Sequence, residues 1–273
     1  MSSSKTKTPL ITKTLSGACS FFQHVTSFFY LIWKMLGLVV QGFVHPRKIF
    51  KLRHIAEQML LTGLGSVPIV MLTSLLLGMT LAMLATYTLK DFGAEVWTAA
   101  LVGVGFTRQL GPLITAIVVA GRVGASISAE LGTMRVSEEI DALETMGINP
   151  VRFLVLPRFI ALIIMMPCLT IVSDYIGMLG GFLVSLLKLN MNWPYYKELT
   201  LNALKIGDIV SGLIKSVSFG MIISLIGCYQ GFIVQGGAEG VGRGTTQAVV
   251  NSLIFVIAAD CFFTALFSYI IVY

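Results

Sequence analysis

The sequence predicts an all-α integral membrane protein, built from an N-terminal interfacial helix, five transmembrane helices and a short cytoplasmic helix. Of its 273 residues, 56% are hydrophobic and 12% are charged, which is about half the charged fraction of a soluble domain. Residues 58–89 contain no charged side chain, and about 20 apolar residues are enough for a helix to cross a bilayer. The net charge of +6 therefore bears on orientation, and we expect no nucleic-acid partner.

The N-terminal region, residues 1–56, is predicted to be a basic tail containing an amphipathic helix that lies in the membrane interface. It has no Asp or Glu and is rich in Ser, Thr and Lys, as organellar transit peptides are, although arginine is scarce. Residues 14–33 carry no charge, so a sixth span is the alternative, which would change only the side of the tail. The apolar side chains at helical spacing are Phe21, Val25, Phe28, Phe29, Ile32 and Leu36.

Residues 57–273 are predicted to form the transmembrane domain, with spans at about 62–87, 96–121, 159–187, 209–235 and 247–272. Lys and Arg are distributed unequally: thirteen flank one side, in the N-terminal region and in loops 122–158 and 239–247, and four flank the other. The positive-inside rule then places the N-terminus and loop 122–158 in the cytoplasm. The glycine-rich segment 236–244 lacks a Walker pattern and is predicted to be a flexible connection.

Four ionisable side chains fall within the predicted spans: Arg108, Asp174, Lys215 and Asp260. Such groups cost several kcal/mol unless they are paired or hydrated, so each is a functional candidate. Arg108 could pair with Asp260 or Asp174 to hold helices together, or it could contact a substrate. Lys215 lies near a predicted span end, and we expect it to extend to the interface.

Arg108 has a more specific context, because Gln109 and then Gly111-Pro112 follow it. Gly-Pro interrupts regular helical hydrogen bonding in mid-span, which is tolerated where protein or a water-filled cavity satisfies the backbone. A guanidinium beside such a break suits an anionic lipid head group, although a packing kink with a structural salt bridge is the alternative. We predict Arg108, Gln109 and Asp260 as substrate-binding residues and expect no metal site.

Small residues follow the break at helical spacing, in the segment from Ala120 to Ala129. Positions 120, 124 and 128 lie on one helix face, and positions 121, 125 and 129 lie on the adjacent face. Small side chains let helix backbones approach closely. The pattern therefore predicts tight packing, either within one subunit or across a dimer.

An acidic amphipathic helix is predicted outside the membrane, beginning at Glu138 with Ser137 as its cap. Gly147 is its predicted C-cap, and Asn149-Pro150 ends it. Acidic side chains on a cytoplasmic loop favour a protein partner with a basic groove, with a solvated loop helix as the alternative. The acidic residues are Glu138, Glu139, Asp141 and Glu144, and the apolar edge is Ile140, Leu143 and Met146.

The segments TRQLGP, AGRVGASISAELGTMRVSEEIDALETMGINP and LVLPR, within residues 107–158, resemble the MlaE-type permease family. Its members are membrane subunits of ABC transporters that work with MCE-domain lipid-binding proteins. The similarity continues more loosely through the third span and the segments TTQAVVNSL and AADCFFTAL near the C-terminus. It covers most of residues 50–273. One departure is Gln109, where family members commonly carry Glu.

The resemblance implies a homodimer that encloses a lipid cavity, in a bacterial inner membrane or, as the alternative, an organellar inner envelope. It implies that Glu138–Met146 is a coupling helix docking on a separate ABC ATPase. Substrates would be phospholipids or other hydrophobic lipids, passed between the membrane and an MCE-domain protein. ATP would be used by the partner subunit, so no cofactor is expected in this chain, which has no Walker motif.

Two other functions compete with lipid transport. An ion-coupled secondary carrier could use Arg108, Asp174 and Asp260, but the odd number of spans and the lack of an obvious inverted repeat oppose it. A membrane-embedded enzyme is opposed by the absence of HExxH, GxSxG and paired-aspartate motifs. The chain has only three histidines, all N-terminal.

Overall fold

The computed structural model describes residues 52–271. Within that range every regular element is a helix and no strand occurs, so the predicted all-α class is confirmed. Five of the continuous helical stretches are long and apolar enough to cross a membrane, which confirms the predicted five spans. The N-terminal interfacial helix and its six-span alternative lie outside the described residues.

The spans extend further than the apolar windows alone indicated. In the second span a single helical rod continues well beyond the predicted end at residue 121, as far as Val136. The five spanning stretches are His54–Lys90, Glu95–Val136, Val151–Leu189, Ile206–Phe232 and Gly237–Tyr269.

The first two spans are broken by short turns of other helix types. The first consists of α3 (Leu52–Thr62), the 3₁₀ turn η1 (Leu64–Ser66) and α4 (Val67–Lys90). The second begins with the 3₁₀ turn η2 (Glu95–Trp97) and continues as α5 (Thr98–Gly105), η3 (Phe106–Leu110), α6 (Gly111–Val119), η4 (Ala120–Gly124) and α7 (Ala125–Val136). Both η3 and η4 are π-helical turns.

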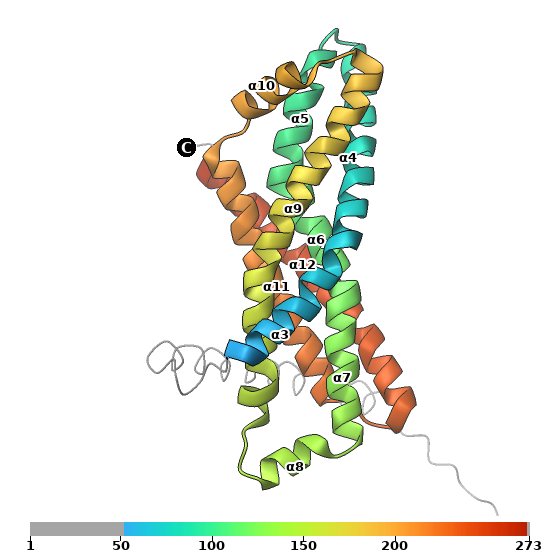
Figure 1. The fold of residues 1–273 in the computed structure, drawn as a ribbon, viewed down its shortest axis with the longest axis vertical. Coiled ribbons are helices and arrows are strands. Elements are labelled where there is room, and N and C mark those ends of the chain that lie inside the picture. Colours follow the sequence, from blue (N-terminus) through green and yellow to red (C-terminus); the bar gives the residue numbers. More distant parts are fainter. Residues whose placement is uncertain (1–51, 272–273) are drawn as a thin grey trace, which may run out of the picture.

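The remaining elements complete the bundle and cap its two ends. They are α8 (Glu139–Thr145), the π-helical turn η5 (Val151–Val155), α9 (Leu156–Leu189), α10 (Trp193–Ala203), α11 (Ile206–Phe232) and α12 (Gly237–Ile271). In Figure 1, α8 lies at the bottom of the bundle and α10 at the top. We call these the α8 end and the α10 end.

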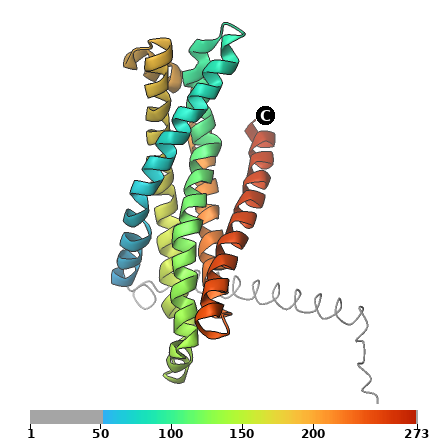
Figure 2. The same ribbon diagram turned by 90° about the vertical axis from the view of Figure 1, so that its right-hand side faces the viewer.

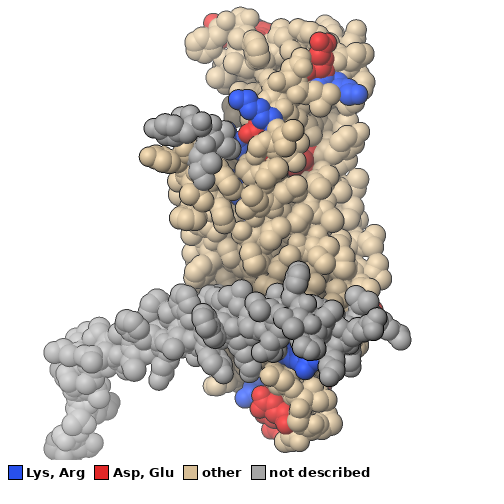
Figure 3. All heavy atoms as spheres, turned by 90° about the vertical axis from the view of Figure 1, so that its left-hand side faces the viewer, with Lys and Arg blue, Asp and Glu red and all other residues tan. Residues whose placement is uncertain are grey.

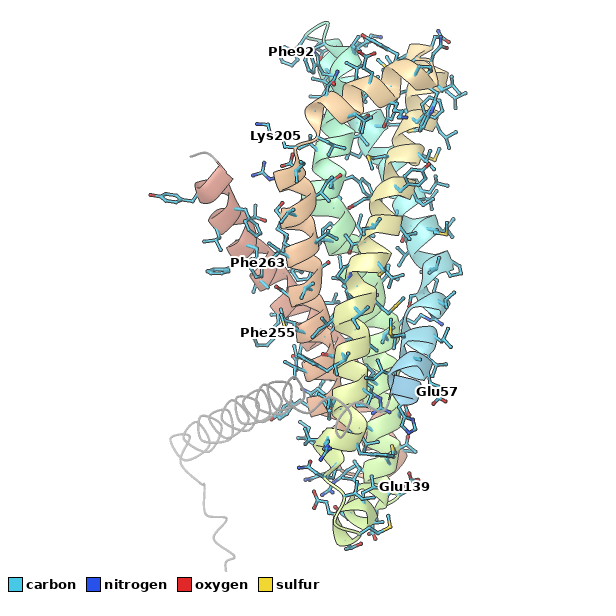
Figure 4. All side chains as sticks on the ribbon, turned by 60° about the vertical axis from the view of Figure 1, so that its left-hand side comes forward. Glu57, Phe92, Glu139, Lys205, Phe255 and Phe263 are labelled. Carbon is cyan, nitrogen blue, oxygen red and sulfur yellow. The ribbon has the colours of Figure 1, made fainter. Side chains whose placement is uncertain are left out.

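The long helices run roughly side by side, and α12 leans away from the others toward its C-terminal end (Figure 2). Charged side chains gather near the two ends of the face in Figure 3, and its middle is mostly uncharged. Burial of many long apolar side chains is incomplete, as at Phe255 and Phe262 of α12. Figure 4 shows Phe255 and Phe263 projecting from α12. This is the surface expected of a protein whose solvent is lipid.

Small residues bring α4 and α9 into close backbone contact. A Cβ on Gly78 would overlap the carbonyl of Gly177, and one on Gly180 would overlap the carbonyl of Leu75. Ser74 and Ser173 share a hydrogen bond of 2.7 Å across the same seam. Close approach and interhelical hydrogen bonds replace the hydrophobic effect as the source of helix association in lipid.

One of the two predicted small-residue faces packs inside the chain. Ala120, Gly124 and Ser128 are buried, and Gly124 lies against Ile223 of α11. The prediction of tight packing within one subunit is confirmed for this face. Gly121 on the adjacent face is exposed and nothing lies within 4 Å of where its Cβ would be, so a role of that face in a dimer stays a prediction.

The predicted flexible connection at residues 236–244 is wrong, because α12 already begins at Gly237. Gly236 and Gly237 have positive φ and make the turn, whereas the later glycines are helical. A Cβ on Gly240 would overlap the carbonyl of Gln235, and one on Gly244 would meet the side chain of Val234. Close packing against the preceding turn here outweighs the weak helix propensity of glycine.

Candidate functional site

A π-helical turn in the second span carries two of the predicted site residues, Arg108 and Gln109. Across this turn, η3, the N–H of Gly111 donates to the carbonyl of Phe106, and Pro112 has no N–H to give. The predicted interruption of regular hydrogen bonding at Gly111-Pro112 is therefore confirmed. Such π-turns inside α-helices are frequent at functional sites.

Lys215 of α11 lies at the centre of a polar cluster formed by Gln109, Lys215, Asp260 and Thr264. Its Nζ donates to Gln109 Oε1 at 2.6 Å, to Asp260 Oδ1 at 2.9 Å and to Thr264 Oγ1 at 2.8 Å. These three bonds use all three ammonium protons, and the residue is only 1% exposed.

The depth of Lys215 follows from where α11 begins. Lys215 is nine residues beyond Ile206, which places it about 14 Å along the helix from the α10 end. The predicted extension of Lys215 to the interface is wrong, because its charge is neutralised by Asp260 inside the bundle.

Gln109 joins the cluster as both donor and acceptor. Its Nε2 donates to Asp260 Oδ2, while its Oε1 accepts from Lys215 and, at 3.1 Å, from Thr264. A carboxylate at this position would lose the donor and place a second negative charge beside Asp260. The uncharged Gln109 therefore keeps the cluster electrically neutral.

Arg108 stands at the margin of this cluster and pairs with a different acid. Its Nη1 lies 4.0 Å from Asp208 Oδ1, and Asp208 also accepts the backbone N–H of Lys205 at 3.2 Å in the first turn of α11. Neither of the ion pairs considered for Arg108, with Asp260 or with Asp174, is formed, because Lys215 pairs with Asp260 and α11 brings Asp208 closer. The Arg108 side chain remains 36% exposed.

Asp174 of α9 does not join the cluster. Its carboxylate lies against Gly111, where a Cβ would overlap Oδ1. Oδ1 has no hydrogen-bond partner among the residues that the structure describes, and no ion pair within them includes Asp174. Of the residues predicted at membrane depth, the structure brings Gln109, Lys215 and Asp260 together and places Asp174 apart.

The site residues predicted from the sequence do not include Thr264 or Asp208. Thr264 is four residues after Asp260 on α12, a spacing that puts both on one helix face, and this spacing could have identified it. Asp208 lies just before the predicted fourth span at residue 209, so it was not considered as an intramembrane group. The helix begins earlier, at Ile206, which brings Asp208 within reach of Arg108.

The acidic helix predicted at Glu138 is present as α8, with a shifted start. Glu138 precedes the helix in the left-handed conformation, at φ 59°. The prediction that Ser137 caps it is wrong, because Glu138 is the N-cap residue and the Ser137 hydroxyl donates back to the Thr133 carbonyl at 3.0 Å. Gly147, at φ 73°, and the Ile148 N–H to Leu143 carbonyl bond of 2.9 Å close the C-terminus as predicted.

The two faces of α8 differ from the predicted apolar edge. Ile140 is 3% exposed and packs in the hydrophobic core with the partly buried Leu143, so both hold the helix against the bundle. Met146 is 66% exposed.

The acidic side chains of α8 are also exposed, and one of them, Asp141, pairs with Arg135 of α7. The free surface of α8 is thus an acidic patch with Met146 at its end, formed by Glu138, Glu139, Asp141, Glu144 and Met146. Figure 4 shows Glu139 at this end of the molecule.

Comparison with known proteins adds an independent line of information. The family model described as Permease MlaE matches residues 55–266. A probable ABC transporter permease protein of Rickettsia typhi is 46% identical over 212 residues, which are 78% of this chain and 82% of the relative. The intermembrane phospholipid transport system permease protein MlaE of Haemophilus influenzae is 34% identical, over 81% of this chain and 84% of the relative. The chloroplastic protein TRIGALACTOSYLDIACYLGLYCEROL 1 of Arabidopsis thaliana is 38% identical, over 79% of this chain and 61% of the relative.

Proposed function

The chain belongs to the MlaE permease family of ABC transporters, and we propose that it moves phospholipid, or a similar hydrophobic lipid, between its membrane and an MCE-domain partner protein. It is a multi-pass membrane protein, and the permease subunit of an ABC transporter is non-catalytic. A separate ATPase subunit would hydrolyse ATP, so this chain would hold no cofactor of its own. The phospholipid assignment follows the Haemophilus relative, whose name states that transport.

The proposal rests on one observation. The partly exposed Arg108 lies at membrane depth beside the polar cluster, whose charges balance. Arg108 and Lys215 face two carboxylates, Asp208 and Asp260, so the group as a whole carries no net charge. Thr264 is exposed and Gln109 is half-buried, so the cluster reaches the surface of the single chain. The partly exposed guanidinium of Arg108 could meet a lipid with an anionic head group there.

We propose that two copies of this chain enclose that surface, which would turn an exposed polar patch within the membrane into a lipid cavity. The protein would lie in a bacterial inner membrane with the N-terminus and the α8 end in the cytoplasm, since most flanking Lys and Arg lie on that side. The chloroplastic relative makes an organellar inner envelope the alternative location. An ion-coupled carrier is less well supported, because Lys215 already neutralises Asp260.

The acidic patch on α8 is the proposed docking site for the ATPase. Glu138, Glu139 and Glu144 are exposed, while Ile140 fixes the helix to the core. A basic groove on the partner would complement them. The helical stretch that carries Arg108 continues through α7 to α8. A displacement of α8 would therefore be transmitted along this stretch to the proposed lipid site.

The lipid role is tested by transport in proteoliposomes that contain the ATPase and the MCE-domain partner. Arg108→Ala should reduce transport of anionic phosphatidylglycerol by about tenfold, the loss of one charge-assisted contact, and that of zwitterionic phosphatidylcholine much less. Arg243→Ala is a matched control, because Arg243 is exposed and pairs with Glu239 one turn away on α12. Equal losses for both lipids would assign Arg108 to a structural ion pair with Asp208.

The coupling role is tested by reversing the three glutamates together, Glu138→Lys, Glu139→Lys and Glu144→Lys. ATPase binding should weaken by roughly a hundredfold, because like charges would then face each other across the interface. Reversal of Asp91 and Glu198, which lie near the α10 end, is the control and should leave ATPase binding unchanged. Full ATPase binding by the triple variant, with the membrane domain folded, would exclude α8 as the docking site.

A further inference from the structure

Figure 1 shows α3 bending into α4 and α7 running toward the α8 end. Between these helices opens a groove that is separate from the polar cluster. Its volume is about 230 Å³, and its walls are α3 on one side and η4 with α7 on the other. Polar side chains line it from both walls, among them Gln58, Thr62, Arg122 and Ser126. We call it the elbow groove.

The elbow groove lies at the depth of a lipid head group. Ser66 lies immediately before α4, the longer part of the spanning stretch His54–Lys90, and the 24 residues of α4 reach about 36 Å from there to the α10 end. The hydrocarbon core of a bilayer is about 30 Å thick. Arg108 and Arg122 are fourteen residues apart on one rod, about 21 Å, so the elbow groove is distinct from the proposed transport site.

The guanidinium of Arg122 is held in place by the elbow itself. Its Nη1 donates to Ser66 Oγ at 3.1 Å, and Ser66 Oγ in turn donates to the Thr62 carbonyl at 2.7 Å. A Cβ on Gly65 would meet the guanidinium, so only glycine lets the planar group lie this close to the backbone. No carboxylate lies within ion-pair distance of Arg122 among residues 52–271.

The charges around the groove leave one positive charge uncompensated. Glu130 also lines the groove, but it is bound to Arg158 at 2.7 Å. Arg158 is 3% exposed, and its Nε and Nη1 have no hydrogen-bond partner within the described residues. Arg122 and Arg158 therefore face a single carboxylate, and this favours a monoanionic ligand.

The surroundings of the groove indicate what carries that anion. Leu61 lines the groove and is 69% exposed, and Leu64, in the elbow, is 61% exposed. Exposed leucines beside a cation at the bilayer surface suit a ligand with an anionic head and apolar chains. The planar guanidinium fork matches phosphate oxygens.

We propose that the elbow groove binds the phosphate of one phospholipid of the surrounding leaflet, with Arg122 as its ligand. This lipid is not cargo: it lies in the leaflet at the α8 end and ties α3 to α7 across the bend. The assignment does not depend on which substrate the transporter carries, or on the presence of an ATPase or an MCE-domain protein.

The test is photocrosslinking of the full-length protein in nanodiscs of phosphatidylcholine with a phosphatidylglycerol that carries a diazirine near its glycerol. We expect adducts on peptides containing residues 58–66 and 122–130. Arg122→Ala should reduce these adducts roughly tenfold, and Arg122→Lys should restore part of them. Arg135→Ala, on the same continuous helical stretch Glu95–Val136, should leave them unchanged.

A second variant keeps the proposal testable if Arg122→Ala does not fold. Gly65→Ala retains the positive charge but displaces the guanidinium, so it should also reduce the adducts. Unchanged adducts in both variants, or adducts elsewhere only, would overturn the proposal. Loss of adducts when inorganic phosphate is added would assign the groove to a free phosphate and overturn the lipid assignment. Adducts that persist with phosphate and require Arg122 support it.

Discussion

Asp260 and Asp174 both lie at membrane depth, and their surroundings are opposite. Asp260 of α12 accepts hydrogen bonds from Lys215 and Gln109, so its charge is balanced by a cation on a neighbouring helix. Asp174 of α9 has an oxygen without a hydrogen-bond partner in the described part of the chain, and it lies against the backbone of Gly111. The same side chain is thus part of an ionic network in one place and of a packing seam in the other.

The seam around Asp174 continues along α6 and α9. The two helices run in opposite directions, so Thr115, one turn beyond Gly111, and Thr170, one turn before Asp174, lie farther along the same interface. Both hydroxyls are buried and have no partner atom in the described chain. The residues supplied by the opposing helix, and not the residue type alone, therefore decide whether an intramembrane acid joins an ion pair.

The largest loss of stability is expected when the cation of the polar cluster, Lys215, is removed. Lys215→Met leaves Asp260 as a buried carboxylate without its counter-ion, which should cost about 3–5 kcal/mol of stability. Thermal and chaotrope unfolding of the protein in mild detergent would measure this loss. Lys197→Met is the matched control, because Lys197 is exposed on α10 and its removal should change stability by less than about 0.5 kcal/mol.

The double variant Lys215→Met with Asp260→Met separates a charge effect from a packing effect. Replacement of a whole buried ion pair by apolar side chains is often neutral in stability, so the double variant should regain most of what Lys215→Met loses. A double variant as unstable as the single one would show that the shape of Lys215, and not its charge, supports the bundle.

A smaller effect is expected at the seam. Gly111→Ala places a methyl group where the Asp174 carboxylate now lies, and overpacking of this kind costs about 1–3 kcal/mol. The second change Asp174→Ala removes the obstructing carboxylate and should restore stability. Gly121→Ala, in the same span but with open space around the added Cβ, is the control. Failure of Asp174→Ala to relieve Gly111→Ala would mean that the π-turn backbone itself requires glycine.

The spans and the end of α8 could be predicted because their signals are local. A charge-free window such as 58–89 identifies a membrane helix by composition, and Gly147 with Asn149-Pro150 identifies a helix end by backbone geometry. The partners of Arg108 and Lys215 could not be predicted in this way. Lys215 and Asp260 are 45 residues apart in the chain, and the true start of α11 decided both the depth of Lys215 and the reach of Asp208.

The glycine-rich segment 236–244 is a second case in which a local sequence pattern did not predict the structure. Glycine spacing at 236–244 is typical of a flexible connection, yet the helix begins at Gly237 because its glycines fit against Val234 and Gln235. Local propensity is a weak preference of about 1 kcal/mol per glycine, and tertiary packing can exceed it. The sequence could identify which residues carry charge and where helices end, but which side chains meet depended on the packing of helices distant in sequence.

The smallest predicted change in stability comes from replacing Asp174 by asparagine, and it tests directly whether Asp174 and Asp260 differ. Asp174→Asn keeps the size of the side chain, and no counter-ion in the described residues would be stranded, so stability should change by less than about 1 kcal/mol. Asp260→Asn makes the same substitution where Lys215 would lose its counter-ion, and it should cost about 3 kcal/mol or more. Unfolding measured side by side under one set of conditions gives the difference directly. If the two variants lost equal stability, the fold would depend on the carboxylate of Asp174 as much as on that of Asp260, and the two aspartates would then serve the membrane domain in the same way.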